Sequence, residues 1–179
     1  MEVPKTYTPQ SIAGVWRLLR DAFWARFGSV PSATTLALAA GVVGLETGGG
    51  RFIVQNNFGN IMAGPGWGGA YWPRPTSDPR QPTRFRAYPT AVDGASDFWA
   101  TLARNHRGAL AAMAQGDASA VTAELYRSSY VVGGNARAYR DGVAHWARQV
   151  SGRGWVLPIA ATVAALGVVG VASRMEARA

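Results

Sequence analysis

The sequence predicts a mainly α protein with a small Gly- and Pro-rich β-lobe and an apolar C-terminal segment. Three observations support this fold class. Apolar residues recur at helical spacing through most of the chain up to residue 150. Residues 64–83 are instead dense in Gly, Pro and Trp, a composition typical of loops and short strands. Beyond residue 150 the pattern changes again, because residues 155–172 contain no charged side chain.

The length of 179 residues fits one compact domain with a terminal appendage, and a hydrophobic content of 48% supports a sizeable core. We predict three parts. An N-terminal segment with an amphipathic helix occupies residues 1–30, the main domain occupies residues 31–150, and an anchor with a short tail occupies residues 151–179.

Helix start and stop signals place the individual elements. The first helix is expected at residues 11–27, closed by Gly28, and the second at residues 31–46, with Ser32 as its N-cap. A short strand is expected at residues 85–88. The remaining helices are expected at residues 91–104, 108–114, 118–128 and 135–150, with Asp93, Asp117 and Asn135 as start signals.

Glu46 lies at an unusual place for a carboxylate. It ends an uncharged, apolar helix that the glycines at positions 48–50 cannot continue cheaply. The C-terminal end of the helix dipole is negative, and the neighbouring helix wall is apolar. Both effects favour the protonated carboxylic acid, which is the form that a general acid needs near neutral pH.

Several motifs resemble one protein family in their order and spacing. They are GLETGGG at residues 44–50, NFGNI at residues 57–61, FRAY at residues 85–88, ASDFW at residues 95–99, and the later Tyr130 and Tyr139. Through these motifs, residues 31–150 resemble the lysozyme-like glucosaminidases that cut bacterial peptidoglycan (glycoside hydrolase family 73, with flagellar rod-assembly hydrolases and autolysins). Two positions depart from the family pattern, since Thr47 replaces the usual serine and Asn60 is inserted before the isoleucine.

The resemblance implies an α+β lysozyme-like fold and cleavage of a β-1,4 glycosidic bond of the cell wall, with Glu46 as the general acid. The family's second carboxylate, where there is one, lies in the β-lobe, and Asp78 is the sole acidic residue between Glu46 and Asp93. Asp78 would activate water as the base, although its Thr-Ser-Asp-Pro context equally suits an ordinary turn. Without such a base, the N-acetyl group of the substrate could assist the reaction.

The resemblance also assigns residues to the glycan. Tyr130 would orient the sugar or stabilise charge, or would simply be packed, and Asn57 and Phe58 would form the groove floor below Glu46. Tyr88, in the FRAY segment, is a further expected substrate-binding residue. Aromatic side chains in the Gly- and Pro-rich stretch suit either the flat faces of sugar rings or a merely structural loop. These aromatic residues are Trp67, Tyr71 and Trp72.

Two other functions stay open at this point. A lytic transglycosylase uses one Glu and needs no water nucleophile, which is compatible with a lone carboxylate. A catalytically inactive virion membrane or structural protein on a lysozyme scaffold would account for the change of serine to Thr47 and for the uncertain second carboxylate.

Composition narrows the range of partners and cofactors. The net charge of +8 favours polyanions such as cell-wall polymer or anionic lipid, but the Arg residues are scattered and match no nucleic-acid motif. We therefore expect peptidoglycan glycan strands as the partner, and not nucleic acid. The chain has no Cys and two His, so no disulfide, metal or cofactor is expected. His106, beside Arg104 and Arg107, is expected in a solvated loop.

Residues 155–172 predict a membrane span. A helix of this length reaches about 27 Å, close to the hydrocarbon thickness of a bilayer, and Arg153 and Arg174 flank it as interface anchors would. A buried core helix is the alternative. Residues 1–10 show no apolar block typical of a secretory signal peptide. A C-terminal anchor without a signal peptide fits a phage virion, in an internal membrane or an entry apparatus beside other virion proteins, where the enzyme would open the wall during entry or release. The bacterial inner membrane is the other location considered.

Overall fold

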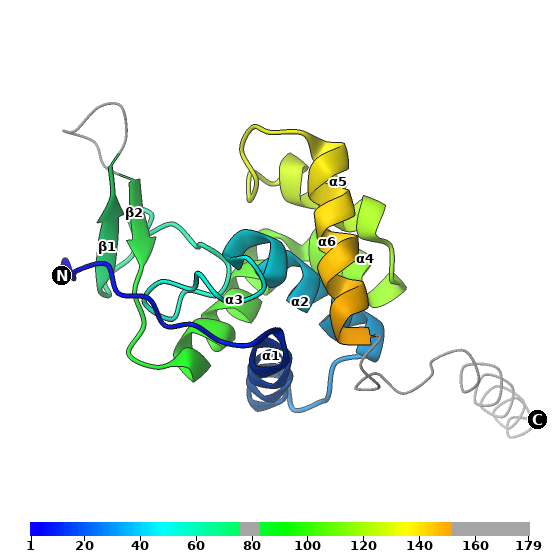
Figure 1. Cartoon of the computed structure of the whole chain (residues 1–179), viewed down its shortest axis with the longest axis horizontal. Coiled ribbons are helices and arrows are strands. Elements are labelled where there is room, and N and C mark those ends of the chain that lie inside the picture. The colour runs from blue at the N-terminus through cyan, green and yellow to red at the C-terminus, as the bar shows by residue number, and fades with distance from the viewer. Residues whose placement is uncertain (76–82, 152–179) are drawn as a thin grey trace, which may run out of the picture.

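The computed structural model describes residues 1–75 and 83–151 (Figure 1). A helical lobe and a small β-lobe lie side by side, as the sequence predicts. The helices are α1 (Ile12–Phe27), α2 (Ala33–Thr47), α3 (Ala91–Asn105), α4 (Arg107–Gln115), α5 (Ala118–Arg127) and α6 (Ala136–Val150). The strands β1 (Tyr71–Arg74) and β2 (Thr83–Arg86) pair antiparallel, with Trp72 opposite Phe85.

The helix ends agree with the capping signals in the sequence. Ser11 and Ser32 accept a hydrogen bond from the backbone N–H three residues later, and Asp117 and Asn135 also cap their helices. Helix α3 differs, because its N-cap is Thr90. Asp93 lies in the first turn instead, where its carboxylate accepts a hydrogen bond from the Thr90 hydroxyl.

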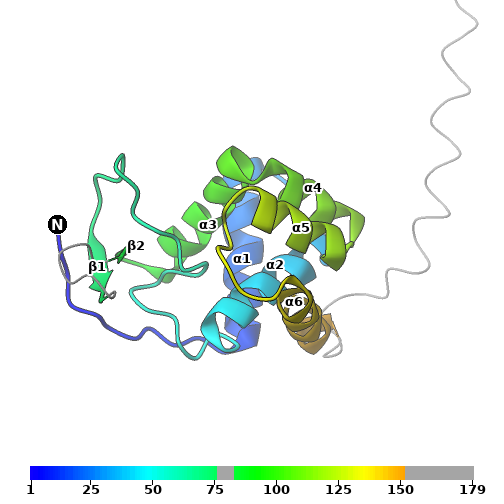
Figure 2. The same ribbon diagram turned by 90° about the horizontal axis from the view of Figure 1, so that it is seen from above.

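Helix α2 forms the centre of the helical lobe and packs against α1, α4 and α6 (Figure 2). It is buried along nearly its whole length, which explains why its sequence contains no charged residue before Glu46. Two glycines let α6 approach its backbone. A Cβ atom at Gly41 would lie 2.5 Å from the carbonyl oxygen of Val143, and one at Gly44 would lie 2.8 Å from the side chain of Trp146.

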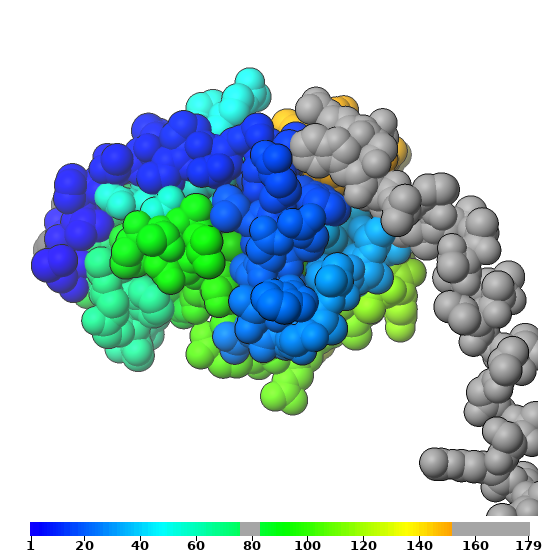
Figure 3. Space-filling model, turned by 90° about the horizontal axis from the view of Figure 1, so that it is seen from below, coloured from blue at the N-terminus to red at the C-terminus, as the bar shows by residue number. Residues whose placement is uncertain are grey.

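The N-terminal ten residues join the two lobes. Glu2 forms an isolated β-bridge with Tyr71 of β1, and Tyr7 forms another with Val54, before α1 begins. Figure 3 shows this segment, in dark blue, running along the surface from the β-lobe to α1. Helix α1 then packs on α2 and α3, so its buried side chains share the core of the main domain.

The strand predicted at residues 85–88 lies two residues earlier, because the Tyr88 N–H donates to the carbonyl of Gln55 and turns the chain away from the sheet. Among the described residues, no helix is both long and apolar enough to cross a bilayer. The span predicted at residues 155–172 lies outside them, as does Asp78.

Candidate active site

Glu46 lies on the last turn of α2, as predicted, and is partly exposed. Thr47, the residue after Glu46, fixes the C-terminal end of α2. The Thr47 hydroxyl donates to the Val43 carbonyl at 2.6 Å and accepts from the Gly50 N–H at 3.0 Å. Thr47 is fully buried, so its hydroxyl makes the turn contacts while its methyl group packs in the interior. A threonine at this position thus holds the helix end and the glycine turn together.

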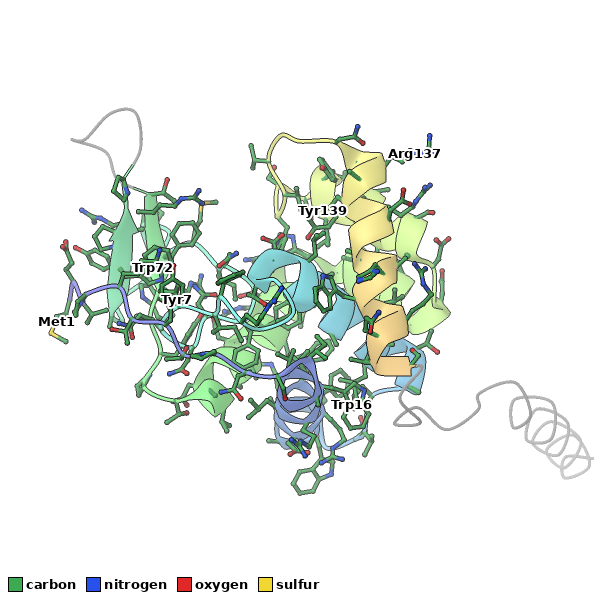
Figure 4. All side chains as sticks on the ribbon, viewed as in Figure 1. Met1, Tyr7, Trp16, Trp72, Arg137 and Tyr139 are labelled. Carbon is green, nitrogen blue, oxygen red and sulfur yellow. The ribbon has the colours of Figure 1, made fainter. Side chains whose placement is uncertain are left out.

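The Glu46 carboxyl receives one neutral hydrogen-bond donor on each oxygen. Tyr139 lies on α6 (Figure 4). Its hydroxyl donates to Oε1 at 2.9 Å. The Asn60 side-chain amide donates to Oε2 at 3.3 Å and also to the Glu46 backbone carbonyl at 2.9 Å. No Arg or Lys within the described residues forms an ion pair with Glu46. In the part of the chain that the structure describes, the Glu46 carboxyl is therefore held by neutral donors.

The two donors differ in whether they can also accept a hydrogen bond from a protonated Glu46. An amide NH₂ can only donate, so Asn60 keeps Oε2 as an acceptor. A phenol can both donate and accept, so Tyr139 can stay bonded when Oε1 carries a proton. Desolvation and the nearby Glu46 charge raise the pKa of Tyr139, so its hydroxyl keeps its proton throughout the physiological range. The arrangement favours Oε1 as the protonated oxygen of the acid.

Two cavities adjoin these groups. The first, which we call the helix cavity, has a volume of about 460 Å³ and is lined by Leu45, Glu46, Tyr126, Tyr139 and residues 131–135. The second, the lobe cavity, has a volume of about 320 Å³ and is lined by residues 59–62, Arg86, Thr101, His106 and residues 128–130. Asn60 lines the lobe cavity and bonds to Glu46, so the carboxyl lies one hydrogen bond from the second cavity. Glu46 is the sole acidic residue among the residues that line these two cavities.

Asn57 and Phe58, which were expected to form the groove floor below Glu46, are not among the residues that line the two cavities. Both side chains are buried. The Asn57 amide exchanges hydrogen bonds with the backbone N–H and carbonyl of Ile61 and donates to the Arg86 carbonyl at 2.9 Å. It thereby ties the loop that bears Asn60 to β2. Asn60 itself has a φ of 48°, a left-handed conformation that asparagine tolerates better than most residues.

The Tyr130 hydroxyl binds a backbone carbonyl, and the Tyr88 hydroxyl binds a carboxylate. The Tyr130 hydroxyl donates to the Gly59 carbonyl at 2.7 Å, and desolvation raises the pKa of this hydroxyl. Tyr88 is buried and donates to Asp97 at 2.6 Å, and burial with this carboxylate raises its pKa as well. Asp97 also pairs with Arg86 at 2.6 Å. Tyr130 lines the lobe cavity, whereas Tyr88 is not among the residues that line either cavity.

The aromatic residues of the β-lobe separate into different environments. Trp72 is buried and stacks on Phe85 at a ring distance of 4.9 Å, so it belongs to the small core of the β-lobe, contrary to the expectation of a saccharide-lining residue. Trp67 is partly exposed beneath the guanidinium of Arg86. Tyr71 lies beneath another guanidinium, that of Arg84. Neither Trp67 nor Tyr71 lines the two cavities, and sugar contact by them stays a prediction.

His106 is buried at the junction of α3 and α4. It is 8% exposed, whereas a solvated loop was expected. Its backbone ends α3 and begins α4, and its ring packs edge-to-face on Tyr130 at 5.0 Å. Burial lowers the pKa of His106. The flanking Arg104 and Arg107 suggested solvent, but the immediate junction of two helices was the signal for an inward turn. No group of three or more His, Asp or Glu residues in the described part of the chain could hold a metal ion.

The fold is similar to that of a protein of known structure. The structure is similar to the glycoside hydrolase domain from Salmonella typhimurium FlgJ, with a TM-score of 0.55 at 20% identity, covering 79% of this chain and 87% of that one. A C-terminally truncated form of the same domain gives a TM-score of 0.54 at 20% identity, covering 79% and 95%. No family model matches the sequence, and no curated protein does. At this identity the similarity shows the fold, and it confirms the predicted lysozyme-like arrangement of a helical lobe with a small β-lobe.

Proposed function

We propose that this protein is a glycoside hydrolase that cleaves a β-1,4 glycosidic bond of peptidoglycan, as an N-acetylglucosaminidase, with Glu46 as the general acid. The observation that carries the proposal is the setting of Glu46. It is a partly exposed carboxyl at the end of a buried helix, between two cavities, with a neutral donor on each oxygen. The fold shared with a glycoside hydrolase domain supports the reaction class.

The hydrogen bonds suggest how the acid would work. Oε1 would give its proton to the leaving glycosidic oxygen while Asn60 holds Oε2 in place. When the proton has left, the carboxylate keeps two donors, because Tyr139 can reverse its hydrogen bond and donate again. The charge that develops on Glu46 would thus be stabilised by groups that are already in place, and only the Tyr139 hydroxyl would have to rotate.

The second catalytic group is less constrained. Asp97 is engaged by Arg86 and Tyr88, so it does not serve as a free base. Asp78, which lies outside the described residues, stays the proposed base for a water nucleophile, the role of the second carboxylate in inverting enzymes. Assistance by the N-acetyl group of the substrate needs no second carboxylate. A lytic transglycosylase is the second candidate function, favoured by the single acidic residue among those that line the two cavities.

Digestion of purified peptidoglycan by the full-length chain tests the proposal. We expect Glu46→Gln to lower the cleavage rate by about a hundredfold or more, because an amide cannot donate the acidic proton. Glu124→Gln is the matched control, since Glu124 lies on α5 and pairs with the exposed Arg127. Equal cleavage by the Glu46 variant would show that Glu46 is not the acid.

Mass spectrometry of the products separates the remaining candidates. Reducing ends at N-acetylglucosamine support the glucosaminidase, and anhydro-muramyl ends support the transglycosylase. A folded wild-type chain that cleaves no peptidoglycan of several wall types would favour the inactive scaffold.

Membrane anchoring through residues 155–172, and a place in a virion or in the bacterial inner membrane, rest on the sequence alone. We propose the anchor as a feature separate from catalysis. Deletion of residues 155–172 should release the protein from membranes washed at high pH while the cleavage rate in detergent stays unchanged. Continued sedimentation of the deleted form with membranes would contradict the anchor.

A further inference from the structure

The C-terminal end of α1 carries an exposed apolar patch that the proposed reaction does not use. Its residues, which we call the α1 patch, are Trp24 (60% exposed), Phe27 (40%) and Val30 (67%), the last in the connection to α2. Trp24 and Phe27 are three positions apart, so they share one face of the helix. Phe27 is held there by Phe23, whose ring lies 4.5 Å from it and 4.9 Å from the buried Trp99. Large apolar side chains gathered at the surface of a folded lobe are typical of an interaction site.

Basic side chains accompany the α1 patch. Residues 12–30 contain three Arg and one Asp, so their net charge is three minus one, or +2. Arg20 pairs with Asp21, whereas Arg26 forms no ion pair within the described residues. The Arg26 guanidinium lies 5.7 Å from the centre of the Phe27 ring. Aromatic rings with Arg beside them are the side chains with which proteins lie at the headgroup level of an anionic bilayer.

The packing of α6 on α2 places the α1 patch at the end of the molecule from which the chain continues beyond Ser151. The two helices run antiparallel, because Glu46 at the end of α2 bonds to Tyr139 near the start of α6, whereas a Cβ atom at Gly41 would lie 3.3 Å from Ala147. The end of α6 therefore lies at the start of α2, which the connection bearing the α1 patch reaches. The apolar segment 155–172 begins four residues after Ser151, a chain length of at most about 14 Å.

We propose that the α1 patch docks on the surface of an anionic bilayer, with Trp24 and Phe27 at the headgroup level and Arg26 on a lipid phosphate. Residues 155–172 themselves are a poorer match for the patch, because Arg153 and Arg174 flank them and would bring like charges to its basic edge.

The contact goes beyond the proposed anchor and the proposed reaction, since it uses folded residues that neither involves. Figure 3 shows α1, in blue, at the surface of one face of the molecule. Glu46 lies near the other end of α2, about 20 Å along the helix from its start. Docking through the α1 patch therefore leaves the helix cavity uncovered.

Spin labelling of the full-length chain tests the contact at a single position. The chain has no Cys, so one introduced Cys carries the label at a known place. Val30→Cys labels the α1 patch, and Val132→Cys is the matched control, because Val132 is 79% exposed beside the helix cavity. We expect vesicles of phosphatidylcholine with about 30% phosphatidylglycerol to slow collisions of the label at position 30 with a neutral, water-soluble nickel complex about threefold or more. The label at position 132 should keep its collision rate.

Lipid composition and two further variants test the chemistry of the contact. Pure phosphatidylcholine should protect position 30 less, because it offers no net negative charge to Arg26. In the Val30→Cys protein, Arg26→Gln and Trp24→Gln should each shift the ratio of docked to undocked protein about fivefold toward the undocked form. Arg137→Gln, in the first turn of α6, is the control for a lost exposed charge and should leave that ratio unchanged. Circular dichroism checks that each variant is folded.

Four results would each overturn the proposal. They are an unchanged collision rate at position 30, an equal fall at positions 30 and 132, equal protection by both lipid mixtures, and protection of position 30 before any vesicle is added. The last result would show that a second copy or another part of this chain covers the α1 patch. None of these measurements depends on cleavage of peptidoglycan, so failure of the docking surface and failure of the proposed reaction are distinguishable.

Discussion

Replacing Tyr139 by Phe removes the hydroxyl that donates to Glu46 Oε1 and leaves the ring in place. The bond is 2.9 Å long and its acceptor becomes charged during the proposed reaction. A hydrogen bond to a charged group contributes about 1.5–3 kcal/mol when it is buried, and water replaces part of that here because Glu46 is partly exposed. We therefore expect the activation free energy of cleavage to rise by about 1.4 kcal/mol, which is a tenfold loss in kcat.

Steady-state cleavage of purified peptidoglycan measures this change, and circular dichroism confirms that the variant is folded. Tyr126→Phe is the matched control. Tyr126 lines the same helix cavity and packs edge-to-face on Tyr139 at 5.9 Å, but it makes no hydrogen bond to Glu46. A Tyr139→Phe protein with wild-type kcat, or an equal loss in Tyr126→Phe, would refute the role of the Tyr139 hydroxyl in stabilising the carboxylate.

Three further predictions concern stability. Gly41→Ala should lower the free energy of unfolding by about 1–3 kcal/mol, because its Cβ would meet the Val143 carbonyl at 2.5 Å, whereas Gly68→Ala, with open space around it, should have no such effect in thermal melts. Asn57→Ala should cost about 2–4 kcal/mol in urea unfolding and also lower activity, because it leaves buried backbone groups of the loop and of β2 unpaired. Burial lowers the pKa of His106, so the unfolded chain binds its proton more readily, and stability should fall as the pH drops below about 6.5. His106→Asn should reduce this loss between pH 7.5 and 5.5, and an unchanged pH dependence would contradict it.

The helices of the helical lobe were predictable, because their ends and their burial depend on residues close together in the sequence. Ser32 and the glycines at positions 48–50 mark the ends of α2, and its lack of charge indicates burial, so the position of Glu46 was predictable. The β-lobe depends on backbone pairings between residues far apart in the sequence, such as Glu2 with Tyr71, and no local sequence pattern predicts these pairings. With four residues in β1, alternation is too short to show which aromatic side chain is buried.

The site shows the same division between local and distant information. In the sequence, Asn60 is an insertion relative to the family motif. In the structure, its side-chain amide donates to both the backbone carbonyl and the side chain of Glu46. Its tendency toward left-handed backbone was a usable signal, but the contact with Glu46 was not. His106 shows the converse error, because charged neighbours in sequence do not determine where a side chain at a helix junction points.

The position of the Glu46 carboxyl depends on three buried contacts, and no charged partner holds it within residues 1–75 and 83–151. Thr47 fixes the end of α2, Asn57 fixes the loop that bears Asn60, and the small residue at Gly41 brings α6, and with it Tyr139, close to α2. An ion pair would hold Glu46 equally well but would favour the carboxylate and oppose proton donation. Neutral donors anchored by buried contacts allow the carboxyl to gain and lose a proton without rearrangement. If Glu46 is the general acid, as proposed, this requirement accounts for the amide and the phenol beside it in a protein whose net charge is +8.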